Sequence, residues 1–210
     1  MRIGELSRRT GVSVPTIKFY VREGLLPAGE LTSPNQASYG EAHVQRLRLI
    51  RALLDVGGLS VAAIREVILA VDDSERPVHK VLGTVAVRMV PRYDRDPGAG
   101  IEKARERVGA LIAERGWRVH PDGPAPEALA VALDALEEVG HGAFTEALDA
   151  YADAAERVAR ADLEYVAHHV AREELVESVV VGTVLGDAIF SALRRMAQTD
   201  ASDRAFGRTT

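Results

Sequence analysis

The chain contains no cysteine, which excludes disulfide bonds and thiolate metal sites. It also lacks a long hydrophobic run. The most apolar stretch, Ser178 to Gly186, lies between Glu177 and Asp187 and is far shorter than the ~20 residues that cross a bilayer. The N-terminal residues show no signal segment. We therefore expect a cytoplasmic protein with no membrane partner.

Motifs of common enzyme classes are absent as well. The sequence has no phosphate-binding loop, no Gly-x-Ser-x-Gly elbow and no zinc-protease motif. Two pairs with i, i+4 spacing, Glu164 with His168 and His169 with Glu173, have residue types that bind metals. Because the two histidines diverge by about 100° around a helix, the four side chains do not face one ion. We predict that the protein is not an enzyme, with no catalytic residue, no cofactor and no metal site.

What the chain does contain is an uneven distribution of charge. Over all 210 residues the net charge is −5, and 47% of the residues are hydrophobic, which is enough for a substantial core. Residues 1–71 hold nine Lys/Arg and six Asp/Glu, a balance of +3, whereas residues 72–210 hold seventeen and twenty-five, a balance of −8. The basic N-terminal part is therefore the part that we expect to meet phosphates.

The basic part begins with two short helical segments. Gly4 to Arg9 is amphipathic, and Gly11 ends it. Ser13 is suited to N-cap a second helix, and Pro15 fits the first turn of that helix. Two short helices around a tight turn predict a helix-turn-helix, whose second helix enters the major groove of DNA.

The spacing of residues gives this second helix two faces before it ends at Gly24. Ile17 and Val21 are four residues apart and are predicted to share the buried face. The other side carries hydroxyl, cationic and aromatic groups that suit contacts with bases and phosphates. These groups belong to Thr16, Lys18, Phe19, Tyr20 and Arg22.

Several motifs in this region carry a family resemblance through their order and spacing. They are Ile3–Ser7, Gly11–Ser13, Lys18–Tyr20, Glu23–Pro27, Tyr39–Glu41, Val44–Leu47 and Leu59–Glu66. Together they resemble the N-terminal domain of the MerR family of transcriptional regulators. The resemblance implies a winged helix-turn-helix with a small β wing, which binds double-stranded promoter DNA as a homodimer and reshapes it.

The wing is predicted between Ala28 and Ser38, a stretch rich in turn-forming residues. The family usually has Gly-Tyr-Arg before the tyrosine that matches Tyr39, where this chain has Asn35, Gln36 and Ala37. Without a wing arginine, neutral hydrogen bonds from Gln36, Ser38 and Tyr39 are expected to hold phosphates. The complete set of candidate DNA-binding residues is Ser13, Pro15, Thr16, Lys18, Phe19, Tyr20, Arg22, Gln36, Ser38 and Tyr39.

Helical spacing continues beyond the wing. Glu41–Val56, with Leu54 among its inward residues, and Val61–Val71 are predicted to carry the recognition unit as a scaffold. Further helices are predicted over residues 78–90, 101–115, 126–139, 144–170 and 173–197. We therefore predict a mainly α protein. Its parts are a winged helix-turn-helix DNA-binding domain at 1–71, a linker at 72–77, an all-helical effector-binding and dimerisation domain at 78–197, and a flexible tail at 198–210.

A second, shorter resemblance lies near the C-terminus. The stretch Val181–Phe190 is similar to the last helix of tetracycline-repressor-type ligand domains, which implies a helical effector domain whose final helices pair two subunits. Aromatic residues of this part either line an apolar effector pocket or belong to plain core. The candidates are Trp117, Phe144, Tyr151, Tyr165 and Phe190. Because the chain has no cysteine, we expect an organic effector and not a soft metal ion.

The family resemblance implies a role in transcription. A homodimer would bind a pseudo-palindromic promoter, distort its spacer and so act indirectly on RNA polymerase holoenzyme. A regulator that needs no ligand and a protein-interaction module with no effector stay open as alternatives. The subunit seam is expected on the last helix, from Val179 to Leu193, where Gly182 and Gly186 allow close approach. The alternatives are that this face packs inside its own subunit, or that the seam lies at the family's usual place after the DNA-binding domain.

Overall fold

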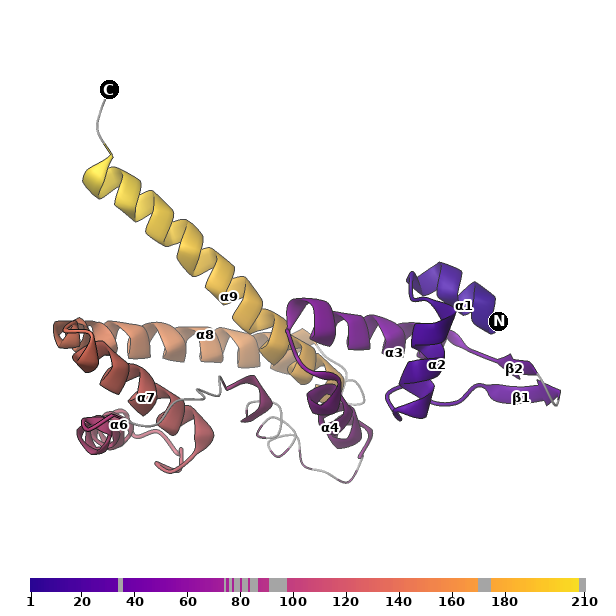
Figure 1. Cartoon of the computed structure of the whole chain (residues 1–210), viewed down its shortest axis with the longest axis horizontal. Helices are drawn as coiled ribbons and strands as arrows, with labels where there is room; N and C mark the ends of the chain where they lie inside the picture. Colours follow the sequence, from indigo (N-terminus) through magenta and orange to yellow (C-terminus); the bar gives the residue numbers. More distant parts are fainter. Residues whose placement is uncertain are drawn as a thin grey trace. The chain divides into compact units, whose positions relative to one another are not determined.

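A computed structural model of the chain describes residues 1–33, 36–73, 75, 77, 80, 83, 87–90, 98–169 and 175–207. The predicted wing residue Asn35, most of the predicted helix at 78–90 and the predicted helix start at Glu173 lie outside these residues. The described elements are helices apart from one two-stranded sheet (Figure 1), so the prediction of a mainly α fold is confirmed. Contacts divide the chain into two compact units, residues 1–85 with 166–210, and residues 86–165.

The first unit contains the helix-turn-helix, its wing and its scaffold. Its elements are α1 (Ile3–Thr10), α2 (Val14–Arg22), β1 (Glu30–Ser33), β2 (Gln36–Ser38), α3 (Glu41–Arg51), the π-helical turn η1 (Ala52–Val56), α4 (Val61–Asp72) and α9 (Leu175–Phe206). The second unit contains α6 (Ile101–Arg115), α7 (Pro124–Glu138), the 3-10 turn η2 (Gly142–Ala147) and most of α8 (Leu148–His169). In the part of the chain that the structure describes, no helix has the length and apolar character needed to cross a membrane.

Aliphatic side chains from all four N-terminal helices form the core of the first unit. Leu6, Ile17, Val44, Ile50 and Ile64 are each 0% exposed. Helix α1 packs against both α2 and α3. Burial of each such side chain stabilises the fold by about 1.5–3 kcal/mol. This core therefore fixes α2 on a scaffold formed by the other N-terminal helices.

Two predicted core positions are wrong. On α2, Tyr20 is only 4% exposed whereas Val21 is half-buried, so the buried face follows the i, i+3 spacing of Ile17 and Tyr20. After α3, Leu53 is 0% exposed whereas the predicted inward residue, Leu54, is half-buried. The π-helical turn η1 contains more residues per turn than an α-helix, which shifts the inward position at this point.

In the second unit, α6 and α7 pack on each other. Their shared core consists of Ile101, Ala104, Val108, Ile112, Ala130 and Leu133. Arg105 of α6 donates from Nε and Nη2 to the two carboxylate oxygens of Glu127 on α7, at 2.9 and 2.6 Å. These hydrogen bonds hold the pKa of Glu127 below its usual value. Asp134, 1% exposed, accepts a hydrogen bond from the Gly98 N–H at 2.9 Å and so fixes the approach to α6.

Helix α9 docks on the N-terminal scaffold through the first part of its length. It contacts η1 and α4, and its Val180 and Val184 are 0% and 1% exposed. A Cβ atom on Gly57 would lie 2.2 Å from Cγ1 of Val184, so the helix approaches η1 closely because Gly57 has no side chain. Val180 and Val184 belong to the stretch predicted to pair two subunits, but here they pack within their own chain.

The C-terminal end of α9 also differs from the prediction. The helix continues to Phe206, so the predicted helix end at Ala197 is wrong. Polar composition suggested a loop, but alanines suit a helix, and Asp200 pairs with Arg204 across one turn at 3.0 Å. The predicted boundary at 197/198 falls inside α9, and residues 166–210 group with the N-terminal residues and not with 86–165. The division into a DNA-binding domain, a linker and an effector domain stays a prediction.

Candidate DNA-binding site

The turn between α1 and α2 is built from local signals. Gly11 ends α1 in the left-handed conformation, with φ 70°, where an L side chain would be strained. Ser13 then caps α2: its Oγ accepts a hydrogen bond from the Thr16 N–H at 3.2 Å and lies 2.7 Å from the Thr16 hydroxyl. Pro15 occupies the first turn of α2, as predicted. The start of the second helix is therefore fixed by residues that also lie on its outer side.

The outward face of α2 carries two exposed cations. Pro15, Lys18 and Arg22 follow one another at helical spacing and are all exposed, and the Arg22 side chain is 73% exposed. Thr16 and Phe19 beside them are half-buried. The Arg22 guanidinium lies 5.3 Å from the centre of the Phe19 ring, a cation–π distance that steadies the arginine on the helix surface. The outward face of α2 therefore presents hydroxyl, apolar and cationic groups close enough together to contact a single groove of DNA.

Two tyrosines of the predicted set belong to the scaffold. Tyr20 and Tyr39 are 4% and 8% exposed, so their rings are not available to DNA. Burial raises the pKa of Tyr20, an effect that the nearby Arg51 guanidinium partly opposes. The Tyr39 N–H donates to the Met1 carbonyl at 2.8 Å, and its ring lies edge-on to His43. The expectation that Tyr20 and Tyr39 hold phosphates does not agree with this burial.

The C-terminal end of α2 is tied to α4 by a contact that sequence reasoning missed. Arg65 of α4 donates from Nε to the backbone carbonyl of Glu23, the residue that caps α2, at 2.9 Å. Its Nη2 also pairs with the Glu23 carboxylate. The two residues are 42 positions apart in the sequence, and no local pattern joins them, so nothing in the sequence alone could have indicated this contact.

The wing is the two-stranded sheet of β1 and β2 (Figure 1). The strands are antiparallel, with Glu30 opposite Ser38 and Leu31 opposite Ala37. Gln36 is exposed and Ser38 half-buried, so of the predicted wing contacts these two remain at the surface. Leu31 is 80% exposed. Neither strand contains a lysine or arginine. The charge available for phosphates is therefore on α2 and not on the wing strands.

Four of the predicted effector-binding residues lie in the second unit, and Phe190 lies in the first. Phe144 and Tyr151 lie together, with ring centres 5.9 Å apart, at 52% and 38% exposed. Trp117 packs on the α6–α7 core, and its Nε1 donates to Glu156 at 2.8 Å. Tyr165 is 63% exposed, and Phe190 belongs to the other unit. An effector site at these residues stays a prediction.

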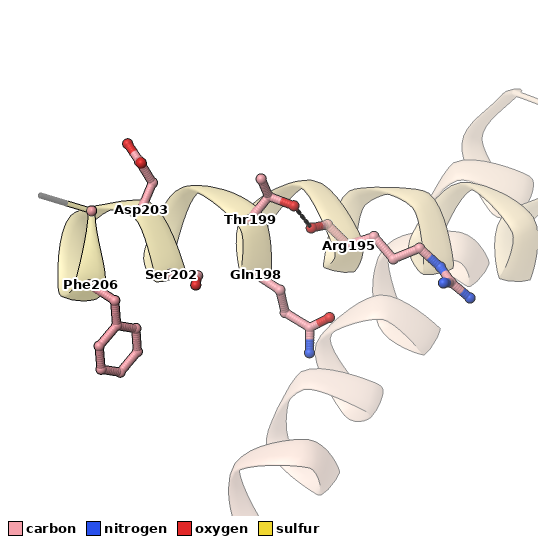
Figure 2. A pocket seen from close by; sticks show the side chains of 7 residues that line it. Arg195, Gln198, Thr199, Ser202, Asp203 and Phe206 are labelled. Carbon is pink, nitrogen blue, oxygen red and sulfur yellow. Dashed lines mark hydrogen bonds between the residues drawn. The ribbon is translucent and has the colours of Figure 1, made fainter.

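A hollow lies along the last turns of α9 (Figure 2). Its lining residues are Arg195, Gln198, Thr199, Ser202, Asp203, Phe206 and Gly207. All of them come from one end of the chain and all are exposed. The hollow is therefore an open helix face and not an enclosed ligand pocket.

The fold and the cationic face of α2 define a winged helix-turn-helix protein. The chain matches the family described as MerR HTH family regulatory protein over residues 1–70. It is 30% identical over 130 residues to heavy metal-dependent transcription regulator 2 of Rhizobium meliloti, with 62% of this chain and 86% of that protein covered. It is also similar to the crystal structure of a protein described as a transcriptional regulator from Streptomyces coelicolor A3(2), with 35% identity, a TM-score of 0.72 and 100% of both chains covered.

The chain belongs to the MerR family, whose members are transcription regulators and not enzymes. A further relative is the nodulation protein NolA of a Bradyrhizobium species, 31% identical over 138 residues. The match covers 66% of this chain but only 52% of that protein, so the chain spans about half the length of this relative. The shorter resemblance of Val181–Phe190 to tetracycline-repressor-type domains stays a prediction.

Proposed function

We propose that the protein is a transcriptional regulator that binds a pseudo-palindromic promoter as a homodimer through the outward face of α2. The observation that supports this proposal is the exposure of Lys18 and Arg22 on a helix whose opposite side, Ile17 and Tyr20, is buried. A helix of nine residues is about 13 Å long, close to the ~12 Å width of the major groove. A rigid scaffold presents this charged face, so ordering the helix adds little cost to binding.

Each residue of this face has a distinct role in the proposal. Thr16 meets a base edge or a thymine methyl group. Lys18 and Arg22 hold phosphates or read guanine edges. Gln36 and Ser38 of the wing donate neutral hydrogen bonds to the backbone. Because the wing strands carry no cation, α2 supplies most of the electrostatic attraction.

In the proposed dimer, the symmetry of the protein determines how the two half-sites of the promoter are arranged. Two copies of α2 read two half-sites whose separation follows the two-fold symmetry of the protein. Bending and untwisting the spacer between the half-sites costs several kcal/mol, offset by the contacts that the deformation permits. The distorted promoter then presents its two contact boxes to RNA polymerase holoenzyme, so the regulator acts on the polymerase indirectly.

The outer half of α9 is the surface that we propose for dimerisation. Ile189, Leu193 and Met196 are 60%, 56% and 67% exposed, with Phe190 beside them, and their spacing places them on one stripe of the helix. Val180 and Val184 are used within the chain, so the seam begins after them. Leu193→Asp in the full chain should shift sedimentation toward the monomer. Leu163→Asp, at an equally exposed leucine of α8, should leave the dimer intact.

A small organic effector is proposed to modulate binding. The Rhizobium meliloti relative is named as heavy metal-dependent, but this chain has no cysteine to bind a soft metal. Titration with zinc, copper or mercury ions should therefore leave DNA affinity unchanged. Trp117 is the single tryptophan, and its hydrogen bond to Glu156 makes its fluorescence a reporter of ligand binding nearby. For a regulator without an effector, no small molecule would change both the Trp117 fluorescence and the DNA affinity.

Selection of DNA from a random-sequence pool tests the proposal. The full chain should enrich an inverted repeat. Binding to the selected duplex should weaken steeply with added salt, because the release of counterions from the DNA becomes less favourable as the salt concentration rises. A scrambled duplex of the same composition is the matched control and should bind far more weakly. Failure to enrich any sequence, together with binding that does not depend on salt, would favour the protein-interaction module.

A further inference from the structure

We propose that Arg65 is a positioning residue that sets the angle at which α2 meets DNA, an inference that rests on the proposed function. Arg65 lies on α4, and its guanidinium holds the end of α2 at two points. Nε donates to the Glu23 carbonyl at 2.9 Å, and Nη2 pairs with the Glu23 carboxylate. Two donors of a rigid planar fork fix direction as well as distance.

Arg65 adds to the contacts that already hold the end of α2, where Leu25 and Leu26 are 0% and 2% exposed and donate from their N–H groups to the Tyr20 carbonyl at 2.9 and 3.2 Å. The buried residues of α2, Ile17 and Tyr20, lie before its last two residues, and Gly24 follows Glu23 with a positive φ of 74°. The last carbonyls of a helix have no partner within the helix, and a cation there is favoured by the helix dipole. Arg65 supplies both the hydrogen-bond donor and the positive charge, from a helix that belongs to the scaffold.

The same contact controls the charge next to Arg22. The Glu23 carboxylate lies 3.5 Å from Nε of Arg22 through one oxygen, and Arg65 engages the other oxygen. Because Arg65 neutralises part of the negative charge of Glu23, the attraction of Glu23 for Arg22 is weaker, and the Arg22 side chain can turn toward DNA. Without Arg65, Glu23 would compete with phosphate for Arg22. Arg65 thereby acts on recognition through Glu23 and Arg22, with no contact of its own to DNA.

Conservative variants separate this role from a direct phosphate contact. Arg65→Lys keeps the charge but loses the two-point fork, so binding to the selected duplex should fall about tenfold, as expected for a charge-assisted hydrogen bond, while binding to the scrambled duplex stays unchanged. Glu23→Gln keeps the carbonyl for Nε and should lower the preference for the selected duplex about threefold. Glu41→Gln, which releases the exposed Arg9 on α1, is the matched control and should preserve the preference.

The opposite results would overturn the proposal. If Arg65 held a phosphate, Lys would substitute for it, and Glu23→Gln would free Arg65 and tighten binding to both duplexes. Full preference in Arg65→Lys, or an unchanged preference for the selected over the scrambled duplex in Glu23→Gln, contradicts the positioning role.

Hydrogen exchange of the free protein tests the contact without DNA. Arg65→Lys should speed amide exchange several-fold at residues 20–25, because the end of α2 opens more often. Exchange in α1 should not change, and Glu41→Gln should leave residues 20–25 protected. Unchanged exchange in Arg65→Lys would show that Arg65 does not hold α2, whatever the DNA result. Failure of the wild type to select DNA would instead remove the proposed function and leave this measurement valid.

Discussion

The two helices that carry the proposed interactions, α2 and α9, are held in opposite ways. Helix α2 has nine residues, is capped by Ser13 and buries Ile17 and Tyr20 in its own unit. Helix α9 has 32 residues and buries Val180 and Val184 near its start, whereas Ile189 and Leu193 further along it are exposed. The short helix exposes charge, and the long helix exposes apolar surface.

This difference indicates which partner each helix suits. A charged face on a helix already fixed by its own chain suits a polyanion, because no ordering is needed before contact. An apolar stripe on a helix that its own chain leaves uncovered favours a second hydrophobic surface. In Figure 1, α2 has the indigo-to-purple colours of the N-terminal part of the sequence, and α9 has the orange-to-yellow colours of the C-terminal part. In the proposed function, DNA recognition and subunit pairing are thus separate tasks of one unit.

Matched isoleucine substitutions should give the largest difference between the two helices. Ile17→Ala removes a fully buried side chain and should lower the free energy of unfolding by about 2–5 kcal/mol at any protein concentration. Ile189→Ala, at 60% exposure, should cost less than about 0.5 kcal/mol in the monomer. Its effect should grow with protein concentration if α9 pairs two subunits. Urea unfolding followed by circular dichroism, at two protein concentrations, measures the change in unfolding free energy for both variants. Equal changes would contradict the difference between α2 and α9.

Two glycines test how α9 is held. Gly57→Ala places a Cβ 2.2 Å from Val184 and 2.8 Å from the Leu53 carbonyl, and its backbone φ of −73° suits alanine. The clash should therefore cost about 1–3 kcal/mol of stability. Gly182→Ala on α9 meets nothing within 4 Å and should stabilise the helix by up to about 1 kcal/mol. Thermal melts of the two variants should move in opposite directions; a stable Gly57→Ala protein would mean that α9 does not dock at η1.

The smallest effect is expected in the wing. Gln36→Ala removes one exposed neutral donor, and its loss should weaken DNA binding by about 0.5–1.5 kcal/mol with no change in the salt dependence. Leu31→Ser, on the strand opposite, removes the exposed aliphatic group and serves as the comparison. A change of salt slope in Gln36→Ala would place a charged contact in the wing, against the absence of cations from both strands.

The helix-turn-helix was predictable because its signals are local. Ser13 and Pro15 start α2 as the sequence indicates, and Gly11 ends α1 in the conformation that favours glycine. The wing strands and the scaffold helices also appear where turn residues and helical spacing predict them. Each of these features depends on residues within a few positions of one another, so one sequence contains the information.

Features that depend on distant residues were not predictable. Tyr20 and not Val21 completes the core of α2 because packing against other helices, α1 among them, decides which side of the helix is buried. The contact of Arg65 with Glu23 spans 42 positions, and the approach of Val184 to Gly57 joins two parts of the chain that are far apart in the sequence. The residues next to Arg65 or Gly57 in the sequence do not indicate whether a distant partner exists.

Salt dependence of DNA binding tests the central claim most directly. The full chain and the Lys18→Ala/Arg22→Ala variant should be titrated with the selected duplex over a range of salt concentrations. Arg118→Ala, which removes an exposed cation of the other unit, is the control. The account predicts that the double variant binds more weakly and that its slope of log affinity against log salt is shallower by about two units per subunit, while the control matches the wild type. Wild-type affinity and slope in the double variant would contradict recognition by α2.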